Sequence, residues 1–221
     1  MTSPQTIPDE NQISELLEAL RRNRMDAYFV ASRQEVVPLL ETLLREGDTV
    51  ATGGSVTLAQ TGVTALLQSG KYRFIDRNAP GLSPEQRRQV AADTAKADVF
   101  LCSCNAVTMA GELYNVDGNC NRISAMVYGP QSVIFVVGIN KVVADLSAAV
   151  RRVKTVAAPQ NGVRLGLRTP CALTGTCVAV NGDMTDGCDN EHRMCCNYLV
   201  SGKQRQPGRL KVVLVGESLG Y

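Results

Sequence analysis

The run Ser132 to Gly138 (Ser-Val-Ile-Phe-Val-Val-Gly) carries apolar side chains without polar alternation, which constrains the fold strongly. A strand of this kind is buried on both faces, and such strands belong to parallel sheets that helices cover. Further β-rich runs lie at 26–30, before Gly53, and at 72–75, 98–103 and 209–215. Since helical patterns alternate with these runs, we expect an α/β, Rossmann-like fold with a mostly parallel sheet and helices on both faces.

The spacing of apolar residues predicts the helices between these strands. Ser83-Pro84 is a typical helix start, with a serine cap and proline in the first turn. Short extended pieces around Ala110-Gly111 predict a small hairpin region. The expected helices cover 11–23, 33–44, 58–68, 83–96, 121–128 and 142–156. We expect a ligand-binding core over 1–168, a Cys-rich C-terminal extension over 169–198, and a strand returning to the core over 199–221.

Composition excludes several classes of function. The net charge is +2, Trp is absent, and aromatic residues make up 5% of the 221 residues, so nothing indicates nucleic-acid binding. Residues 1–11 are polar and show no secretory signal, and the longest apolar stretch, 133–137, is too short to span a membrane. We therefore expect a cytoplasmic protein whose cysteines are reduced thiols or metal ligands.

A turn with two glycines, Gly53-Gly54-Ser55, joins an apolar run to a helical pattern that begins near Leu58. Glycine lets an anion approach the backbone closely, and Ser55 or Thr57 can cap the helix or donate a hydroxyl. The turn thus predicts an anion-binding site for a phosphate, a carboxylate or a coenzyme tail. The alternative is a tight strand-to-helix turn without a ligand.

Many polar side chains lie between residues 105 and 141. Some follow the predicted strand at 98–103, and others follow the predicted strand at 132–138. Glu112 and Asp117 are candidate catalytic carboxylates, and Lys141 with Arg122 can hold a carboxylate or phosphate. The alternative is that Asp117 makes a turn, Arg122 pairs with a carboxylate, and Lys141 is solvated. Because parallel strands end at one edge of a sheet, we expect these residues to meet the glycine turn there. The remaining candidate ligand-binding residues here are Asn105, Asn119, Asn121 and Asn140.

The segments 113–130 and 133–141 resemble the bacterial lactate-utilization (LUD) domain family. The Gly53 turn, residues 74–77, Ala158-Pro159 and the segment 215–221 are similar to its stand-alone members. The resemblance implies the fold of ribose phosphate isomerases, glucosamine phosphate deaminases and CoA transferases, which bind phosphorylated sugars or CoA esters at strand ends. It also implies lactate oxidation alongside iron–sulfur proteins for some members. One departure is Cys120, where the family pattern usually has glycine.

Five of the eight cysteines lie between positions 171 and 196, together with the single histidine, His192. Clustered cysteines in a reduced chain favour a metal site, and a segment with few large apolar residues gains folding energy from one. The preferred ligand set is Cys171, Cys177, Cys188 and Cys195. The resemblance supports this set and favours an iron–sulfur cluster over zinc. Thiols without metal, or a disulfide pair, are the alternatives.

Three functions remain open at this point. The first is a protein of organic-acid metabolism that binds a small anionic ligand and works with redox protein partners. The second is a sugar-phosphate isomerase or CoA-transferase-like enzyme with Glu112 or Asp117 as the catalytic carboxylate. The third is a non-catalytic sensor or complex subunit, and a homodimer is one expected assembly. We expect buried free thiols at Cys102 and Cys104 and not nucleophiles. Likewise, we expect a loop histidine at His192 and not a general base.

Overall fold

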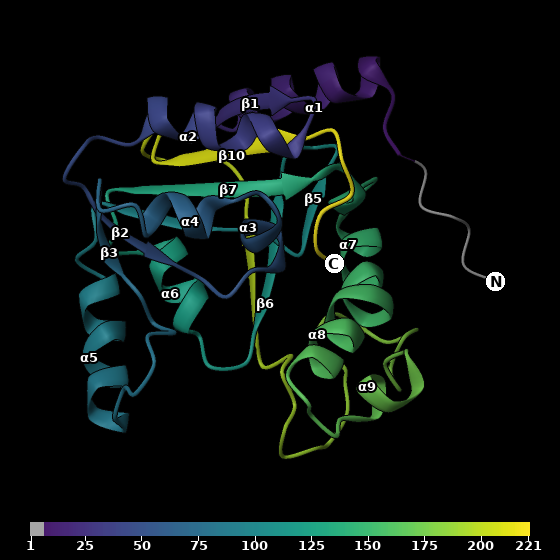
Figure 1. Ribbon diagram of the computed structural model, residues 1–221. Helices are drawn as coiled ribbons and strands as arrows, with labels where there is room; N and C mark the ends of the chain where they lie inside the picture. Colours follow the sequence, from purple (N-terminus) through teal and green to yellow (C-terminus); the bar gives the residue numbers. More distant parts are fainter. Residues whose placement is uncertain (1–6) are drawn as a thin grey trace.

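A six-stranded parallel sheet forms the centre of the computed structural model, which describes residues 7–221 (Figure 1). Every neighbouring pair of strands runs parallel, which confirms the predicted fold class. Val133 to Val137 are fully buried in the middle of the sheet, as their apolar run predicted. In spatial order the strands are β1 (Asp26–Val30), β10 (Leu210–Val215), β7 (Ser132–Gly138), β4 (Val99–Cys102), β2 (Thr49–Thr52) and β3 (Arg73–Ile75).

Helices cover both faces of this sheet. Phe135 of β7 lies in a core cluster with α1 (Glu10–Arg22) and α6 (Asn121–Val127). Its neighbour Ile134 points to the opposite face, into a second cluster. This second cluster contains residues of α2 (Val36–Leu43), α3 (Val56–Gln60) and α4 (Val63–Leu67). Alternate side chains of one apolar strand therefore build two separate cores.

Local sequence signals set several helix starts. Ser83 caps α5 (Pro84–Thr94) by accepting from the backbone N–H of Gln86, and the Gln86 side chain accepts in return, as predicted. The expected continuous helix over 58–68 is wrong. Gly62, with φ of +76°, separates α3 from α4, because a residue in the left-handed conformation interrupts a right-handed helix. A 3-10 helix, η1 (Arg33–Glu35), precedes α2. The polar stretch 1–11, in which we expect no secretory signal, lies partly outside the described residues.

A second, four-stranded sheet lies beside the first. Its order is β8 (Val142–Val143), β5 (Ala106–Thr108), β6 (Leu113–Asp117) and β9 (Asn197–Ser201). The antiparallel pair β5–β6 confirms the predicted hairpin region. Strand β9 was not expected, and it pairs antiparallel with β6, with Tyr198 opposite Val116. The end of the Cys-rich segment is thereby tied to the small sheet.

The helix predicted over 142–156 is displaced. A 3-10 turn, η2 (Ile139–Lys141), precedes this range, and β8 occupies its start. Helix α7 (Leu146–Arg152) begins only after Asp145, which caps it. The helix then continues through a π-helical turn (Val153–Ala157) into α8 (Ala158–Arg164). Pro159 lacks a backbone N–H and its ring crowds the preceding turn, which accounts for the wider turn at this point. In Figure 1, α7, α8 and α9 (Pro170–Thr174) lie together beyond the carboxyl end of β7.

The residues from 175 to 196 contain no helix or strand. Two residues of this stretch, Met184 and Cys195, pack against a third core cluster with the small sheet and α7, so the predicted extension is not confirmed. All eight cysteines lie in the described part of the chain, and all are free thiols. The proposed division at residues 168 and 198 stays a prediction. No described helix combines the length and apolar character needed to cross a membrane.

Candidate functional site

A cleft of about 570 Å³ lies where the carboxyl ends of the parallel strands meet the small sheet, α8 and the Cys-rich segment. Segments far apart in the chain converge on it, as the sequence predicted. From the predicted set, the cleft is lined by Gly54, Ser55, Thr57, Asn105, Asp117, Asn119, Asn121, Arg122 and Lys141. This volume suits a small organic ligand.

Three predicted residues do not line the cleft. Glu112 lies at the β5–β6 turn, where its carboxylate accepts from the Thr108 hydroxyl at 2.9 Å. Gly53 lies behind the cleft, and a Cβ there would meet the Arg122 side chain at 3.0 Å, so glycine permits this close approach. Asn140 accepts from the Leu219 backbone N–H at 3.0 Å and positions the C-terminal segment. The structure therefore leaves Asp117 as the one predicted catalytic carboxylate on the cleft.

Lys141 is the most unusual residue of the cleft. Its side chain is almost fully buried, at 3% exposure. Its Nζ donates to the hydroxyls of Thr57 at 2.8 Å and Ser103 at 3.0 Å. Burial lowers the pKa of Lys141 to about 8, although the nearby Cys104 thiol opposes the shift. None of the ion pairs within residues 7–221 involves this ammonium group.

The C-terminal segment approaches Lys141 closely. Gly220 has φ of +57°, and a Cβ at this position would lie 2.6 Å from Thr57 Oγ1 and 3.3 Å from Lys141 Nζ. Only glycine combines this conformation with so near an approach. The Asn140 amide donates to the Gly220 carbonyl at 3.3 Å, and Gln60 accepts from the Gly220 N–H at 2.7 Å. The last residues thus close one side of the lysine site.

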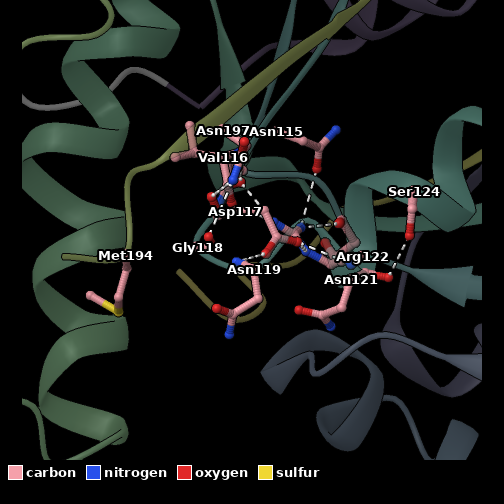
Figure 2. A network of polar contacts seen from close by, with 12 residues as sticks. Asn115, Val116, Asp117, Gly118, Asn119, Asn121, Arg122, Ser124, Met194 and Asn197 are labelled. Carbon is pink, nitrogen blue, oxygen red and sulfur yellow. Dashed lines mark hydrogen bonds and ion pairs between the residues drawn. The ribbon is translucent and has the colours of Figure 1, made fainter. Parts of the chain in front are cut away.

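Arg122 is the centre of a polar network (Figure 2). The network adjoins Lys141 through Ser103, whose carbonyl accepts from Arg122 and whose hydroxyl accepts from Lys141. Its guanidinium donates to the Val116 carbonyl at 2.6 Å and to the side-chain oxygens of Asn105 and Asn115 at 3.3 and 3.2 Å. Asp117 lies 3.7 Å from Arg122 Nε and accepts from the backbone N–H groups of Asn119 and Arg122, both at 3.1 Å. The Asp117 carboxylate therefore holds the turn into α6 as well as facing the cleft.

Positive side chains outnumber negative ones around the cleft. Asp117 and Glu191 are its acidic side chains within the described chain, and each lies beside a basic group, Arg122 and His192. The cationic residues on the lining are Arg77, Arg122, Lys141, Arg164 and Arg193. Such an excess in a concave, partly buried site favours binding of an anion.

Buried groups behind the cleft support the same charge pattern. Arg152 is 4% exposed and donates to the carbonyls of Asn105 at 2.6 Å and Asn140 at 3.1 Å. Burial lowers its pKa to about 10, against the opposing influence of Cys104. Burial also raises the thiol pKa of Cys102 and Cys104, which keeps both protonated and argues against either as a nucleophile.

Comparison with known proteins places this chain in a family. The LUD domain family matches residues 13–215, most of the chain. The chain belongs to the LUD domain family. The resemblance to this family that the sequence showed is thereby confirmed. Among curated proteins, no sequence matches this LUD-domain chain significantly.

One solved structure agrees with the fold of this LUD domain. A DUF162 family protein from Deinococcus radiodurans has a TM-score of 0.52 at 15% identity, over 93% of this chain and 96% of its own. Weaker likenesses are to eIF2B beta from Chaetomium thermophilum, with a TM-score of 0.36 at 16% identity over 61% and 47% of the two chains. The alpha subunit of a malonate decarboxylase from Acinetobacter baumannii gives 0.33 at 14% identity over 62% and 33%. At these identities the likeness concerns the fold alone.

The backbone conformation of Cys120 is one that favours glycine, in line with the glycine that the sequence resemblance led us to expect there. This residue precedes α6 with φ of +57°, a left-handed conformation that glycine adopts without strain. The LUD-domain chain therefore carries a non-glycine residue at a turn built for glycine, directly beside Asp117 and Arg122.

The four predicted metal ligands of this LUD domain lie around one small cavity. The cavity measures about 30 Å³ and is bordered by Cys171, Cys177, Cys188 and Cys195. Burial, together with the other three thiols, raises the pKa of Cys195 to about 12, although Arg193 opposes the shift. Over residues 7–221, no three Cys, His, Asp or Glu side chains are arranged as ligands of one ion. The expected zinc or iron–sulfur group therefore remains a proposal.

Several residues of the cleft escaped prediction. Ser103 follows β4, and its neighbour Cys104 drew attention only as a thiol, although Ser103 holds Lys141. Arg77 and Arg164 lie on the rim, and the Arg164 guanidinium donates to the Tyr221 hydroxyl at 2.6 Å. The position of Ser103 at the end of a parallel strand was a usable signal, whereas isolated surface arginines carry none.

Proposed function

We propose that this LUD-domain protein binds a small carboxylate or phosphorylated ligand in the cleft, as a protein of organic-acid metabolism. Lys141 supplies the central positive charge, and Arg122, held by its network, presents the adjacent edge of the site. The glycine turn Gly54-Ser55 and the Asn119 and Asn121 amides offer further polar contacts. Redox protein partners, cytoplasmic location and a homodimer belong to the same proposal.

The observation that carries the proposal is the state of Lys141. A buried ammonium loses hydration, and this loss is usually offset by a carboxylate. Lys141 instead has two neutral hydroxyl partners, on Thr57 and Ser103, in a cleft with excess positive charge. An anionic ligand supplies the missing counter-charge, which explains why the chain maintains so unfavourable a group.

Binding of named anions to the purified full-length chain tests this proposal. Lactate, pyruvate, ribose 5-phosphate and acetyl-CoA are titrated in calorimetry at pH 7, with the neutral sugar ribose for comparison. We expect one of the four anions, and not ribose, to bind. The affinity should fall about tenfold or more in Lys141→Met, since charge-assisted contacts contribute roughly 1.5–3 kcal/mol.

A matched lysine variant serves as the control. Lys71 pairs with Glu41 on the surface, far from the cleft lining, so Lys71→Met should leave the affinity unchanged. If none of the four anions binds, or if both variants weaken binding equally, the cleft is not the anion site proposed.

The second function, a sugar-phosphate isomerase, has one supporting observation, the Asp117 carboxylate on the cleft. It requires that the purified chain alone interconverts ribose 5-phosphate and its ketose isomer, and that Asp117→Asn abolishes turnover. Two backbone N–H groups already donate to this carboxylate, which leaves it less suited to proton transfer. Binding without turnover would favour the first function.

A further inference from the structure

The Cys-rich segment keeps four thiols together with little regular secondary structure. Cys171 lies in the first turn of α9, Cys177 and Cys188 lie in the irregular stretch, and Cys195 precedes β9, yet all four border one cavity. Cys171 and Cys195 are also part of the third core cluster. Cys196, the immediate neighbour of Cys195, is exposed and does not border the cavity.

Two cationic side chains border this cavity and donate hydrogen bonds to backbone carbonyls of the surrounding segment. The Lys154 ammonium, on the π-helical turn, donates to the carbonyls of Ala179 at 2.7 Å, Gly182 at 3.0 Å and Asp183 at 2.6 Å. The Arg193 guanidinium donates to the carbonyls of Cys195 at 2.9 Å, Cys188 at 3.3 Å and Thr185 at 2.6 Å. Both side chains line the cavity with the thiols, where Asp186 is the one lining carboxylate among the described residues.

We propose that Cys171, Cys177, Cys188 and Cys195 bind one zinc ion as four thiolates, with Lys154 and Arg193 as neighbouring counter-charges. Zinc with four thiolates carries a net charge of about −2, which two adjacent cations balance. The four thiol protons pass to solvent when the ion binds, so no electron transfer is involved. The thiols must turn inward to reach the ion, since the structure does not arrange them as ligands.

The size of the cavity selects a single ion over a cluster. About 30 Å³ holds one or two water molecules, and a zinc ion occupies no more than that. A cluster of four irons and four sulfides is several times larger and would have to displace Tyr114, Met184 or Tyr198, which line the same cavity. The ion would also fix one wall of the cleft, because Arg193, Met194 and Cys195 line both spaces.

Metal analysis of the full-length chain tests the zinc site directly. The protein is produced with zinc and iron both available, purified anaerobically, and examined by elemental analysis and visible absorption. We expect about one zinc per chain and no iron–sulfur absorption. After removal of zinc by a chelator, a Co²⁺ titration should give thiolate-to-cobalt absorption that saturates at about one equivalent.

Two serine variants at neighbouring positions make the test specific. Cys195→Ser should lower zinc affinity by more than the roughly 10–100-fold expected of a change beyond the ligands, while Cys196→Ser should leave it unchanged. Should Cys195→Ser fail to fold, the cobalt titration of the unaltered chain decides alone. Stoichiometric iron with sulfide, a chain without bound metal that takes up no cobalt, or equal loss of zinc in both variants would overturn the proposal.

Discussion

The parallel sheet and the Cys-rich segment achieve order in opposite ways. In β7, five consecutive apolar side chains are fully buried, and backbone hydrogen bonds to β4 and β10 set the register. In residues 175–196, two cationic side chains hold the backbone carbonyls instead. The first arrangement is cooperative over many strands, whereas the second depends on a few long-range contacts. The cleft lies where the two regions meet.

The largest effect should follow from damage to the sheet. Phe135 is fully buried in β7, so Phe135→Ala leaves a cavity and should lower the free energy of unfolding by about 3–5 kcal/mol. Denaturant unfolding measures this loss. The exposed Val127 on α6 is the control, since Val127→Ala should change the value by less than about 0.5 kcal/mol. A loss below about 1 kcal/mol for Phe135→Ala would mean that the sheet does not control stability.

The next prediction concerns Lys141, in the cleft between the two regions. Here a substitution should raise the free energy of unfolding and not lower it. Below pH 8, Lys141 is protonated in both states, and its burial opposes folding. Between pH 8 and its ordinary value near 10.5, only the unfolded chain keeps the proton, so the stability of the native protein rises with pH. Lys141→Met should therefore raise the free energy of unfolding at pH 7 by about 3 kcal/mol.

This difference between the native protein and Lys141→Met should shrink as the pH approaches 10.5. Denaturant unfolding from pH 6 to 10.5 provides the measurement. A variant that is less stable than the native protein at pH 7 would show that Lys141 serves the fold rather than a ligand. A gain in stability together with lost anion binding is the pattern expected of a functional residue.

A smaller and more local effect should follow from Lys154→Met. This change removes three donors to the carbonyls of the Cys-rich segment, and local opening of residues 175–196 should become easier by about 2 kcal/mol. Amide hydrogen exchange should speed up in this segment while β7 keeps its protection. Equal loss of protection in both regions would show that they unfold as one unit, contrary to the contrast drawn between the sheet and the Cys-rich segment.

The smallest effect concerns the turn that leads from β6 into α6. Cys120 has a positive φ, so Cys120→Gly should raise the free energy of unfolding by about 1 kcal/mol. Cys120→Ala is the matched control, because it removes the thiol and keeps the strain. Thermal unfolding in reducing buffer compares the two variants. If alanine stabilises as much as glycine, the effect belongs to the thiol and not to the backbone.

Short-range patterns were enough for much of the molecule. The apolar run in β7 predicted a parallel sheet, and Ser83-Pro84 predicted the start of α5, because burial periodicity and capping are local properties. They also placed Lys141 and Ser55 near the same edge, since parallel strands end together. Glu112 was proposed for the cleft because it lies in a polar cluster of the sequence, yet it does not line the cleft. Closeness in sequence does not determine which side of a hairpin a residue occupies.

Sequence alone determined the alternation of strands and helices, the two-sided core and a minority of the residues around the cleft. Tertiary structure decided the pairing of β9 with β6, the approach of Gly220 to Lys141, and the meeting of four cysteines at one cavity. The reason is physical: periodicity and turn chemistry act over a few residues, whereas these contacts join segments tens of residues apart. Their free energy comes from packing and charge that no local pattern records.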